Sequence, residues 1–309
     1  MSKPLVVIIS GPTASGKTGL SIEIAKRFNG EIVSADSMQI YKSMDIATAK
    51  PTKDETAEIR HHLVDFVEAN ENFSVAKYKQ LALSAIDDIL SRGKLPIVCG
   101  GTGLYIDTLM NNTVFLDYED SGIRERLEKR KESDGIESLY EELKKVDPDT
   151  ASRLHLNDSK RIIRALEVYY LTGKTISEQN SLSHKEESPY DFLLFVLSAH
   201  NREILYKRIN DRVDKMLDMG LVEEAGSFFA SDISKTAKQA IGYKELKPYL
   251  DGEISLETAV EKLKMETRRY AKRQLTWFRN KKNVNWLYID DEKSVSDECA
   301  QIISQNLGA

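Results

Sequence analysis

The sequence predicts an α/β protein, with a doubly wound parallel sheet as its core and an inserted all-helical domain. Residues 11–18 read GPTASGKT, a complete G-x-x-x-x-G-K-T phosphate-binding loop (P-loop) between an apolar strand and a helix. The first hundred residues alternate strand-like and helical segments, which is typical of a parallel sheet. Strand signals are absent between 113 and 189 and return at 192–197. We therefore expect a P-loop-type core formed by 1–112 and 190–309, and a helical insertion at 113–189.

Each element is predicted from the spacing of its apolar residues. Short apolar runs predict strands at Leu5–Ile9, Glu31–Ser34, Leu95–Cys99 and 192–197. Helices of the core are expected at 18–28, Val75–Ser91, Arg202–Met219 and Leu256–Asn280. The insertion is rich in charged residues, and helices are expected there at Ile123–Lys131, Ile136–Lys145 and Lys160–Leu171.

Composition narrows the classes of function. Of the 309 residues, 41% are hydrophobic and 30% charged, which is typical of a globular protein. No apolar run is long enough to cross a membrane, and the two cysteines, Cys99 and Cys299, suggest neither a disulfide framework nor a zinc site. We expect a cytoplasmic protein with no membrane partner. The net charge is −5, yet residues 262–282 hold nine Lys/Arg and one acid, Glu266, so a local basic face is expected.

The P-loop predicts a site for a polyphosphate or pyrophosphate. Its glycines allow a tight turn whose backbone N–H groups point inward, and the following helix adds the positive end of its dipole. Lys17 supplies a point charge, and Thr18 a hydroxyl for Mg²⁺, directly or through water. The expected pyrophosphate-binding residues are Gly11, Pro12, Thr13, Ala14, Ser15, Gly16, Lys17 and Thr18.

Two further strand ends carry candidate site residues. Asp36 follows the strand 31–34, where its carboxylate would face a ligand above the P-loop. It could hold Mg²⁺ through water, act as a general base, or only cap the following turn. The strand 95–99 runs into Gly100-Gly101-Thr102-Gly103, where another backbone or a ligand could approach closely. No Asp ends this strand, which argues against the motor-type and switch-type nucleotide hydrolases.

Together these segments resemble the tRNA dimethylallyltransferase (tRNA isopentenyltransferase, IPP transferase) family. The family signatures GPTASGKT, DSMQ[VI]Y and GGTGLY stand intact at 11–18, 36–41 and 100–105. The resemblance continues through HHLVD at 61–65, KRIIRALE at 160–167, RVDKM at 212–216, AIGYKE at 240–245 and RRYAKRQLTWFR at 268–279. It therefore covers nearly the whole chain.

The resemblance implies a reaction, its substrates and its site residues. The family transfers a dimethylallyl group from dimethylallyl pyrophosphate to N6 of the adenosine immediately 3′ of the anticodon in tRNA, and pyrophosphate leaves. Asp36 is then the base, assisted by Thr13, Lys17, Thr18, Arg212 and Mg²⁺. We expect a monomer that holds the tRNA anticodon stem-loop between two basic clusters. One is the basic stretch 262–282, and the other consists of Lys160, Arg161 and Arg164. The tRNA-binding residues so implied are Asp36, Ser37, Met38, Gln39, Thr102, Arg124, Lys160, Arg161, Arg164, Gly242, Tyr243, Arg268, Arg269, Lys272 and Arg273.

Some alternatives stay open at this level. The chain could be an adenylate isopentenyltransferase, a small-molecule P-loop kinase, or a nucleic-acid-binding module, although the two basic clusters argue against a small acceptor. Arg212 could lie on a solvated helix face. The pair His61-His62 could bind a metal, but adjacent side chains point apart, so a structural or substrate-orienting role is favoured. Tyr270, Ala271, Trp277 and Phe278 are expected to pack in the core rather than stack on RNA.

Overall fold

The protein forms two compact units, and each is described by itself. The computed structural model describes residues 3–113, 115, 122–183 and 187–308. Unit 1 comprises residues 1–108 and 189–309, and unit 2 comprises Leu109–Ser188. The chain thus leaves unit 1 after its first hundred residues and returns to it for the C-terminal part.

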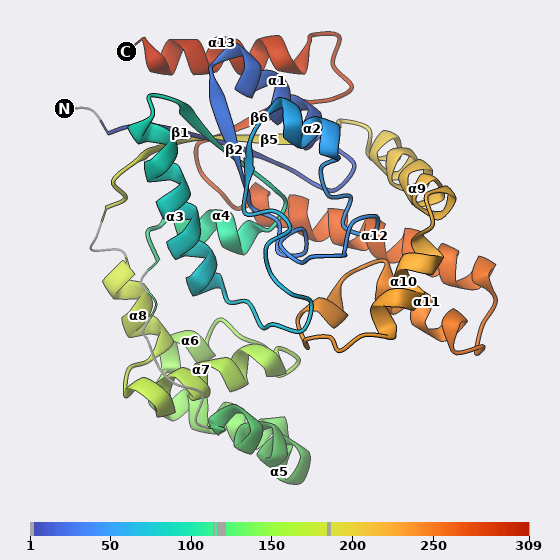
Figure 1. The fold of residues 1–309 in the computed structure, drawn as a ribbon. Helices are drawn as coiled ribbons and strands as arrows, with labels where there is room; N and C mark the ends of the chain where they lie inside the picture. Colours follow the sequence, from blue (N-terminus) through green and yellow to red (C-terminus); the bar gives the residue numbers. More distant parts are fainter. Residues whose placement is uncertain (1–2, 114, 116–121, 184–186, 309) are drawn as a thin grey trace. The chain divides into compact units, whose positions relative to one another are not determined.

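Unit 1 is built on a six-stranded sheet in which every pair of neighbouring strands is parallel (Figure 1). Its strands are β1 (Leu5–Ser10), β2 (Gly30–Ser34), β3 (His61–His62), β4 (Leu95–Cys99), β5 (Asp191–Ser198) and β6 (Val284–Tyr288). The spatial order is β3-β2-β4-β1-β5-β6. Because β5 pairs with the whole length of β1, the chain rejoins the same sheet after unit 2, which confirms the predicted return of the strand at 192–197.

Helices cover both faces of this sheet. The helices of unit 1 are α1 (Lys17–Arg27), α2 (Lys53–Glu58), α3 (Val75–Ser91), α4 (Gly103–Met110), α9 (Arg202–Asp218), α10 (Leu221–Phe229), α11 (Tyr243–Leu250), α12 (Leu256–Arg279) and α13 (Val295–Leu307), not all of which contact the sheet. The helix α3 packs on β2 and β4, while α1 and α13 pack together on the other face. No helix within the described ranges is both long and apolar enough to span a membrane.

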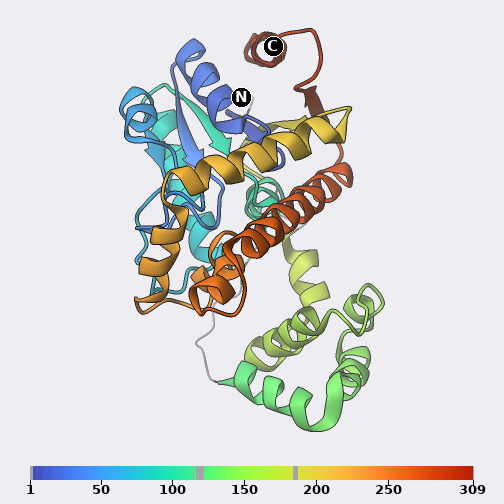
Figure 2. The same ribbon diagram turned by 90° about the vertical axis from the view of Figure 1, so that its right-hand side faces the viewer.

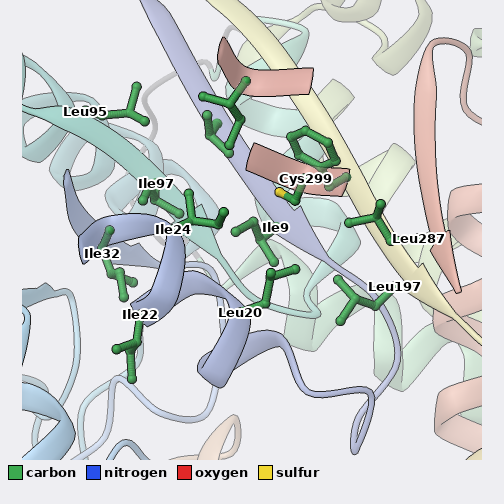
Figure 3. Packing of buried hydrophobic residues seen from close by; sticks show 14 residues of the cluster. Ile9, Leu20, Ile22, Ile24, Ile32, Leu95, Ile97, Leu197, Leu287 and Cys299 are labelled. Carbon is green, nitrogen blue, oxygen red and sulfur yellow. The ribbon is translucent and has the colours of Figure 1, made fainter. Parts of the chain in front are cut away.

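The core beneath α1 and α13 holds the P-loop in place (Figure 3). Ile9 of β1, Ile24 of α1 and Ile97 of β4 are fully buried in it, and α13 contributes Cys299. Burying a side chain of this size contributes about 1.5–3 kcal/mol relative to leaving it in water. The strand and helix that flank the P-loop are therefore anchored independently of any ligand.

The helices α9 and α12 run side by side, as Figure 2 shows. Leu205 and Ile209 of α9 and Ala271 of α12 form a buried cluster, and Ala14 of the P-loop packs against it. This contact fixes both helices beside the carboxyl end of β1. Residues more than 190 positions from the P-loop in sequence thereby become its neighbours.

Unit 2 is helical in its described residues. It contains α5 (Ile123–Val146), α6 (Pro148–Ala151), α7 (Ser159–Thr172) and α8 (Ile176–Ser183), which enclose a small core around Leu139, Ile163 and Leu166. The backbone of α5 leaves the helical region at Gly135, where φ is 80° and ψ is 161°. This break separates the two helices that were predicted at 123–131 and 136–145.

Several elements were not predicted. The strand β3 is only two residues long, and β6 (VNWLY) buries only Leu287 while its other four residues are partly exposed. The helix α13 buries Cys299 and Ile303, and Val295, Ala300 and Ile302 pack against the same core. The predicted P-loop-type α/β class is nevertheless confirmed, and the ends of the predicted core strands and helices lie within one residue of those observed. In unit 2, the helix expected to end at Lys131 instead continues to the break at Gly135.

Candidate active site

A cavity of about 290 Å³ lies at the carboxyl ends of β1, β2 and β4. These three strands are neighbours in the sheet, so the segments that follow them converge on one place. The cavity is lined from below by Thr13, Lys17, Thr18, Asp36, Ser37, Met38, Gln39, Cys99 and Gly100. Its sides come from residues 47–49 and 239–242, from Ile209, Arg212, Val213 and Met216 of α9, and from Leu263, Thr267, Tyr270, Arg273 and Gln274 of α12.

The P-loop forms the anion-binding end of this cavity. Thr13, Lys17 and Thr18 line it, while Gly11, Pro12 and Ser15 are buried as part of the loop framework. Ala14 and Gly16, with Lys17, Thr18 and Arg212, also line a second, more open cavity beside the first. No side chain caps the N-terminus of α1, so its first backbone N–H groups remain available to an anion.

Lys17 is held ready for an anion but is poorly solvated. Its Nζ donates a hydrogen bond to Pro12 O at 2.7 Å. Burial in the cavity lowers the pKa of Lys17 to about 8, because the charged ammonium loses water; Arg212 acts in the same direction, and Asp36 opposes it. An incoming pyrophosphate would supply the negative charge that this ammonium lacks.

We expect the affinity for pyrophosphate to depend on the protonation of Lys17. Below pH 8, Lys17 is charged in the free and bound states, so its contribution to affinity is constant. Above pH 8, binding must take up a proton, and the affinity should fall by up to about tenfold per pH unit. Calorimetric titration with pyrophosphate from pH 7 to 10 measures this, and Lys17→Arg, which stays charged, should flatten the profile. A flat profile for the wild-type protein would contradict the assignment.

Asp36 faces the cavity and also caps the turn that follows it. Its Oδ1 accepts hydrogen bonds from Met38 N at 2.9 Å and Gln39 N at 3.3 Å. In the described part of the chain, Oδ2 accepts none, although Asp36 lines the cavity. The capping role and the cavity-facing role considered from the sequence are thus both present, divided between the two oxygens.

Some of the residues around Asp36 line the cavity, and others support them through hydrogen bonds. Ser37, Met38 and Gln39 line the cavity, and their expected contact with tRNA stays a prediction, whereas Thr102 is not part of the cavity lining. Thr102 Oγ1 instead accepts from Ser37 N at 3.1 Å. The contact to adenosine expected for Thr102 stays a prediction; its hydroxyl supports the backbone at Ser37, which lines the cavity. Gln39 Nε2 donates to Thr48 O and Ala49 O, both at 3.1 Å.

Arg212 reaches the cavity from α9. It is half-buried and lines the wall near Lys17 and Asp36, so it does not lie on a solvated helix face. Burial lowers the pKa of Arg212, while the carboxylate of Asp36 raises it. Lys17 and Arg212 together give this end of the cavity two cations, partly balanced by Asp36.

Gln274 is a cavity residue to which the sequence analysis assigned no role. It is 6% exposed, and its Oε1 accepts from Thr13 N at 3.0 Å while its Nε2 donates to Gly101 O at 2.9 Å. A Cβ on Gly101 would lie 2.1 Å from Nε2, so a side chain at this position would displace the Gln274 amide. The glycine run after β4 thus admits a side chain of α12. Its sequence signals were its place in the family-matching run at 268–279 and its polarity within a predicted helix, and neither indicated its partners.

Gln274 bridges Thr13 N and Gly101 O, and removing this bridge should destabilise unit 1. Gln274→Leu keeps much of the volume but leaves two buried backbone groups unpaired, at a cost of about 2–4 kcal/mol in the free energy of unfolding. Urea unfolding followed by tryptophan fluorescence reports on this unit, because Trp277 and Trp286 both lie in it. The control Gln301→Leu, an exposed glutamine of α13, should stay near the wild-type midpoint. Equal midpoints for both variants would count against the bridge.

Two tyrosines lie where the sequence analysis did not expect them: Tyr270 lines the cavity and Tyr243 is buried in the core. Tyr270, expected in the core, lines the cavity, and the guanidinium of Arg273 lies 5.7 Å from the centroid of its ring. Tyr243, expected to contact tRNA, is fully buried, stacks on Phe228 at 4.1 Å and donates its hydroxyl to Glu224. Its side chain has no surface to offer an RNA, so that expectation is corrected; Gly242 beside it does line the cavity.

The basic residues of α12 also divide into groups. Lys272 and Arg273 are exposed, and Arg273 borders the cavity. Arg269 is exposed but pairs with Glu266 at 2.6 Å. Arg268 donates to Asn210 of α9 at 2.7 Å, so it ties the two helices together. As predicted, Ala271 and Phe278 are buried, and Trp277 is partly so.

Unit 2 carries its own basic surface. Lys160 and Arg161 are exposed at the start of α7. Arg164 and Arg124 both approach Glu167, at 2.8 Å and 3.5 Å, so a single carboxylate faces two guanidinium groups. A net positive charge therefore remains at this end of α7.

His61 and His62 form the strand β3, and each makes a hydrogen bond to a neighbouring group of the protein. His62 Nε2 lies 2.8 Å from Glu31 Oε2, in a group that also includes Arg92 and Lys94, and His61 Nδ1 lies 2.7 Å from Ile59 O. These contacts agree with the structural role favoured for the pair. Across the described residues there is no cluster of three or more His, Cys, Asp or Glu side chains suited to a metal.

Comparison with known proteins assigns the family. A family model described as IPP transferase matches residues 39–281. This chain belongs to the IPP transferase family. Within the family, a tRNA dimethylallyltransferase of Caldanaerobacter subterraneus subsp. tengcongensis is 52% identical over 296 residues, which cover 94% of each chain. The alternatives from other families are thereby set aside.

Solved structures of the family share this fold. The full-length tRNA isopentenylpyrophosphate transferase of Bacillus halodurans has a TM-score of 0.73 at 43% identity, covering 99% of this chain and 97% of that one. A eukaryotic dimethylallyltransferase described as acting on tRNA has a TM-score of 0.81 at 33% identity, covering 98% and 79%. The family likeness thus extends over both units.

Proposed function

We propose that this chain transfers a dimethylallyl group from dimethylallyl pyrophosphate to N6 of the adenosine immediately 3′ of the anticodon in tRNA, releasing pyrophosphate. The observation that carries the proposal is one cavity in which two cations, one from the P-loop and one from α9, lie beside a carboxylate. Lys17 and Arg212 suit a departing pyrophosphate, and Asp36 suits the proton of an attacking amine. A single chain supplies all these groups, so we propose that it acts as a monomer in the cytoplasm.

The cationic end of the cavity would promote departure of pyrophosphate. As the allylic C1–O bond breaks, its electron pair goes to the pyrophosphate oxygen and positive charge grows on carbon. Lys17, Arg212 and the backbone N–H groups of the P-loop stand where the negative charge would grow. Cations positioned before the reaction stabilise that charge without reorganisation.

Asp36 would act at the acceptor end. The new bond forms between N6 and C1, and the proton released from N6 passes to Oδ2, the oxygen that is not used by the turn. Adenine N6 is a weak nucleophile because its lone pair is delocalised into the ring. General-base assistance of this kind typically contributes about 10² to 10⁴-fold.

The residues present fit a Mg²⁺ ion bound chiefly through the substrate. Thr18 lines the cavity and offers one hydroxyl, directly or through water, while no cluster of three acidic or imidazole ligands exists among the described residues. Mg²⁺ commonly keeps several waters and binds through substrate phosphates, which suits so sparse a set of protein ligands. When bound, the ion would neutralise charge on the pyrophosphate.

The exposed cations of α12 would hold RNA at the edge of the cavity. Arg269, Lys272 and Arg273 are exposed, whereas Arg268 serves mainly to join α12 to α9. Lys160, Arg161, Arg164 and Arg124 of unit 2 would add contacts to the stem-loop. The target base must leave the RNA stack to reach Asp36, and a loop nucleotide is unstacked at low cost.

Neutralising α12 should change how tRNA binding depends on salt. In Arg269→Ala/Arg273→Ala, each phosphate that the protein no longer neutralises should reduce the slope of log K against log[salt] by about 0.7–0.9. Filter binding from low to moderate salt measures this slope. The control Lys26→Ala/Lys53→Ala removes two exposed lysines of α1 and α2. The same slope in wild type and the α12 variant would place the RNA surface elsewhere.

A label-transfer assay tests the proposed reaction. Protein, Mg²⁺ and labelled dimethylallyl pyrophosphate are incubated with unmodified tRNA, with the same tRNA carrying guanosine at the target position, and with free AMP or ATP. We expect label in the first tRNA only. Label in free nucleotide alone would indicate an adenylate isopentenyltransferase, and none in any acceptor would overturn prenyl transfer.

A further inference from the structure

Glu224 of α10 binds the backbone of a cavity wall from outside the cavity. Its Oε2 accepts hydrogen bonds from Asp45 N at 3.0 Å and Ile46 N at 2.8 Å, and its Oε1 accepts from Ala47 N at 2.9 Å. Oε1 also accepts from the Tyr243 hydroxyl at 2.7 Å. One carboxylate thus receives four donors, three of them consecutive backbone amides, an arrangement that suits an anion.

The wall that Glu224 holds is otherwise supported by side-chain and turn contacts, among them Thr48 Oγ1 to Met44 O at 2.6 Å and Lys50 Nζ to Tyr41 O at 2.9 Å. Ala47, Thr48 and Ala49 line the cavity, but residues 44–50 form no strand or helix. Two backbone bonds close the turn internally, Ala49 N to Ile46 O and Lys50 N to Asp45 O, both at 3.0 Å. In the described chain, the amides of residues 45–47 have Glu224 as their acceptor. Without this carboxylate they would have no protein partner.

From this wall a chain of hydrogen bonds leads to Asp36. Gln39 Nε2 donates to Thr48 O and Ala49 O, and Gln39 N donates to Asp36 Oδ1. Moving residues 45–49 would therefore disturb the support of the Gln39 side chain and the turn that fixes Asp36. The phosphate end is supported separately, through Gln274 and the core beneath α1.

Glu224 also joins residues 45–47 to the neighbouring wall segment that contains Gly242 and Tyr243. Tyr243, which shares the carboxylate, follows Gly242, and Gly242 lines the cavity. A Cβ on Gly242, whose φ is +112°, would lie 2.8 Å from Ala47 Cβ. The two walls thus touch at Ala47 and Gly242, and Glu224 fixes both sides of that contact.

We propose that Glu224 is a positioning residue for the acceptor half of the reaction. It holds residues 45–47 and, through Gln39, the turn of Asp36, while leaving the pyrophosphate end unaffected. This inference rests on the proposed prenyl transfer for its kinetic consequence. Its structural consequence, the hold on residues 45–47, does not depend on which reaction the cavity performs.

The test compares Glu224→Ala with Glu223→Ala, the exposed neighbour on the same helix. Hydrogen exchange without substrate should show faster exchange of amides 45–47 in Glu224→Ala only. Pyrophosphate affinity should stay within about twofold of wild type, because Lys17 and the P-loop are held elsewhere. The single-turnover rate of transfer to tRNA should fall by about 10- to 100-fold, since small misplacements of reacting groups have effects of this size. Glu224→Gln keeps the side-chain volume and one acceptor oxygen, and it replaces the alanine variant if that fails to fold.

Two results would overturn the positioning role. Unchanged exchange at 45–47 would show that Glu224 does not hold the wall. A parallel decrease in pyrophosphate affinity and rate would show a general structural defect instead. Failure of the proposed function looks different: the wild-type protein would transfer no label, while the exchange result at 45–47 would still report on Glu224.

Discussion

Replacing Asp36 with asparagine is expected to lower the single-turnover rate of prenyl transfer by about 10²-fold or more, with tRNA affinity near wild type. The asparagine Oδ1 can still accept from Met38 N and Gln39 N, so the turn is kept. The variant loses only the basic oxygen, Oδ2. Single-turnover quench measurements give the rate, and filter binding gives the tRNA affinity.

Two further variants test whether Asp36 acts as a general base or only caps the turn that follows it. Asp36→Ala removes both the proposed base and the turn cap. Its transfer rate should therefore be equal to or lower than that of Asp36→Asn, and its free energy of unfolding should be lower. Asp218→Asn, an exposed residue of α9, should transfer at the wild-type rate. If Asp36→Asn reacted at a near-wild-type rate, Asp36 would be a turn cap and the base would have to be sought elsewhere.

Replacing Arg212 with methionine is expected to lower the rate by about 10²- to 10³-fold, the usual effect of removing one group that stabilises developing charge. Arg212 lines the cavity beside Lys17, so its removal leaves the departing pyrophosphate with one cation fewer. The pKa of Lys17 should then rise from about 8, because Arg212 lowers it. The fall of pyrophosphate affinity with pH should accordingly begin at higher pH.

The matched control for Arg212 is Arg202→Met, at the exposed start of the same helix. It should leave both the rate and the pH profile of pyrophosphate binding unchanged. Equal rates for the two variants would show that Arg212 does not stabilise the departing pyrophosphate. A lower rate with an unshifted pH profile would mean that Arg212 acts without influencing Lys17.

The parts predictable from the sequence are those determined by short segments. The P-loop is recognisable because its spacing, its strand and its helix all lie within about 25 residues, and Asp36 follows from its place after a strand. The break at Gly135 is similar, since one glycine divides two helical patterns. In each case the local sequence carries the physical cause.

The parts that escaped prediction depend on contacts between distant residues. Gln274 meets Thr13 across 261 positions, and Glu224 meets Ala47 across 177. No local pattern indicates either contact, because each requires α12 or α10 to be placed beside the sheet first. Tyr243 shows the converse, since its place in a family motif suggested contact with RNA while its ring is fully buried against Phe228.

The most direct test of this account is a crystal structure of the protein with an unreactive thiolo analogue of dimethylallyl pyrophosphate and an anticodon stem-loop. We expect pyrophosphate on the backbone of residues 11–18, with Lys17 Nζ turned from Pro12 O toward it. We also expect the N6 of the target adenine within hydrogen-bond distance of Asp36 Oδ2. An adenine bound away from Asp36, or a pyrophosphate outside the P-loop, would contradict the account.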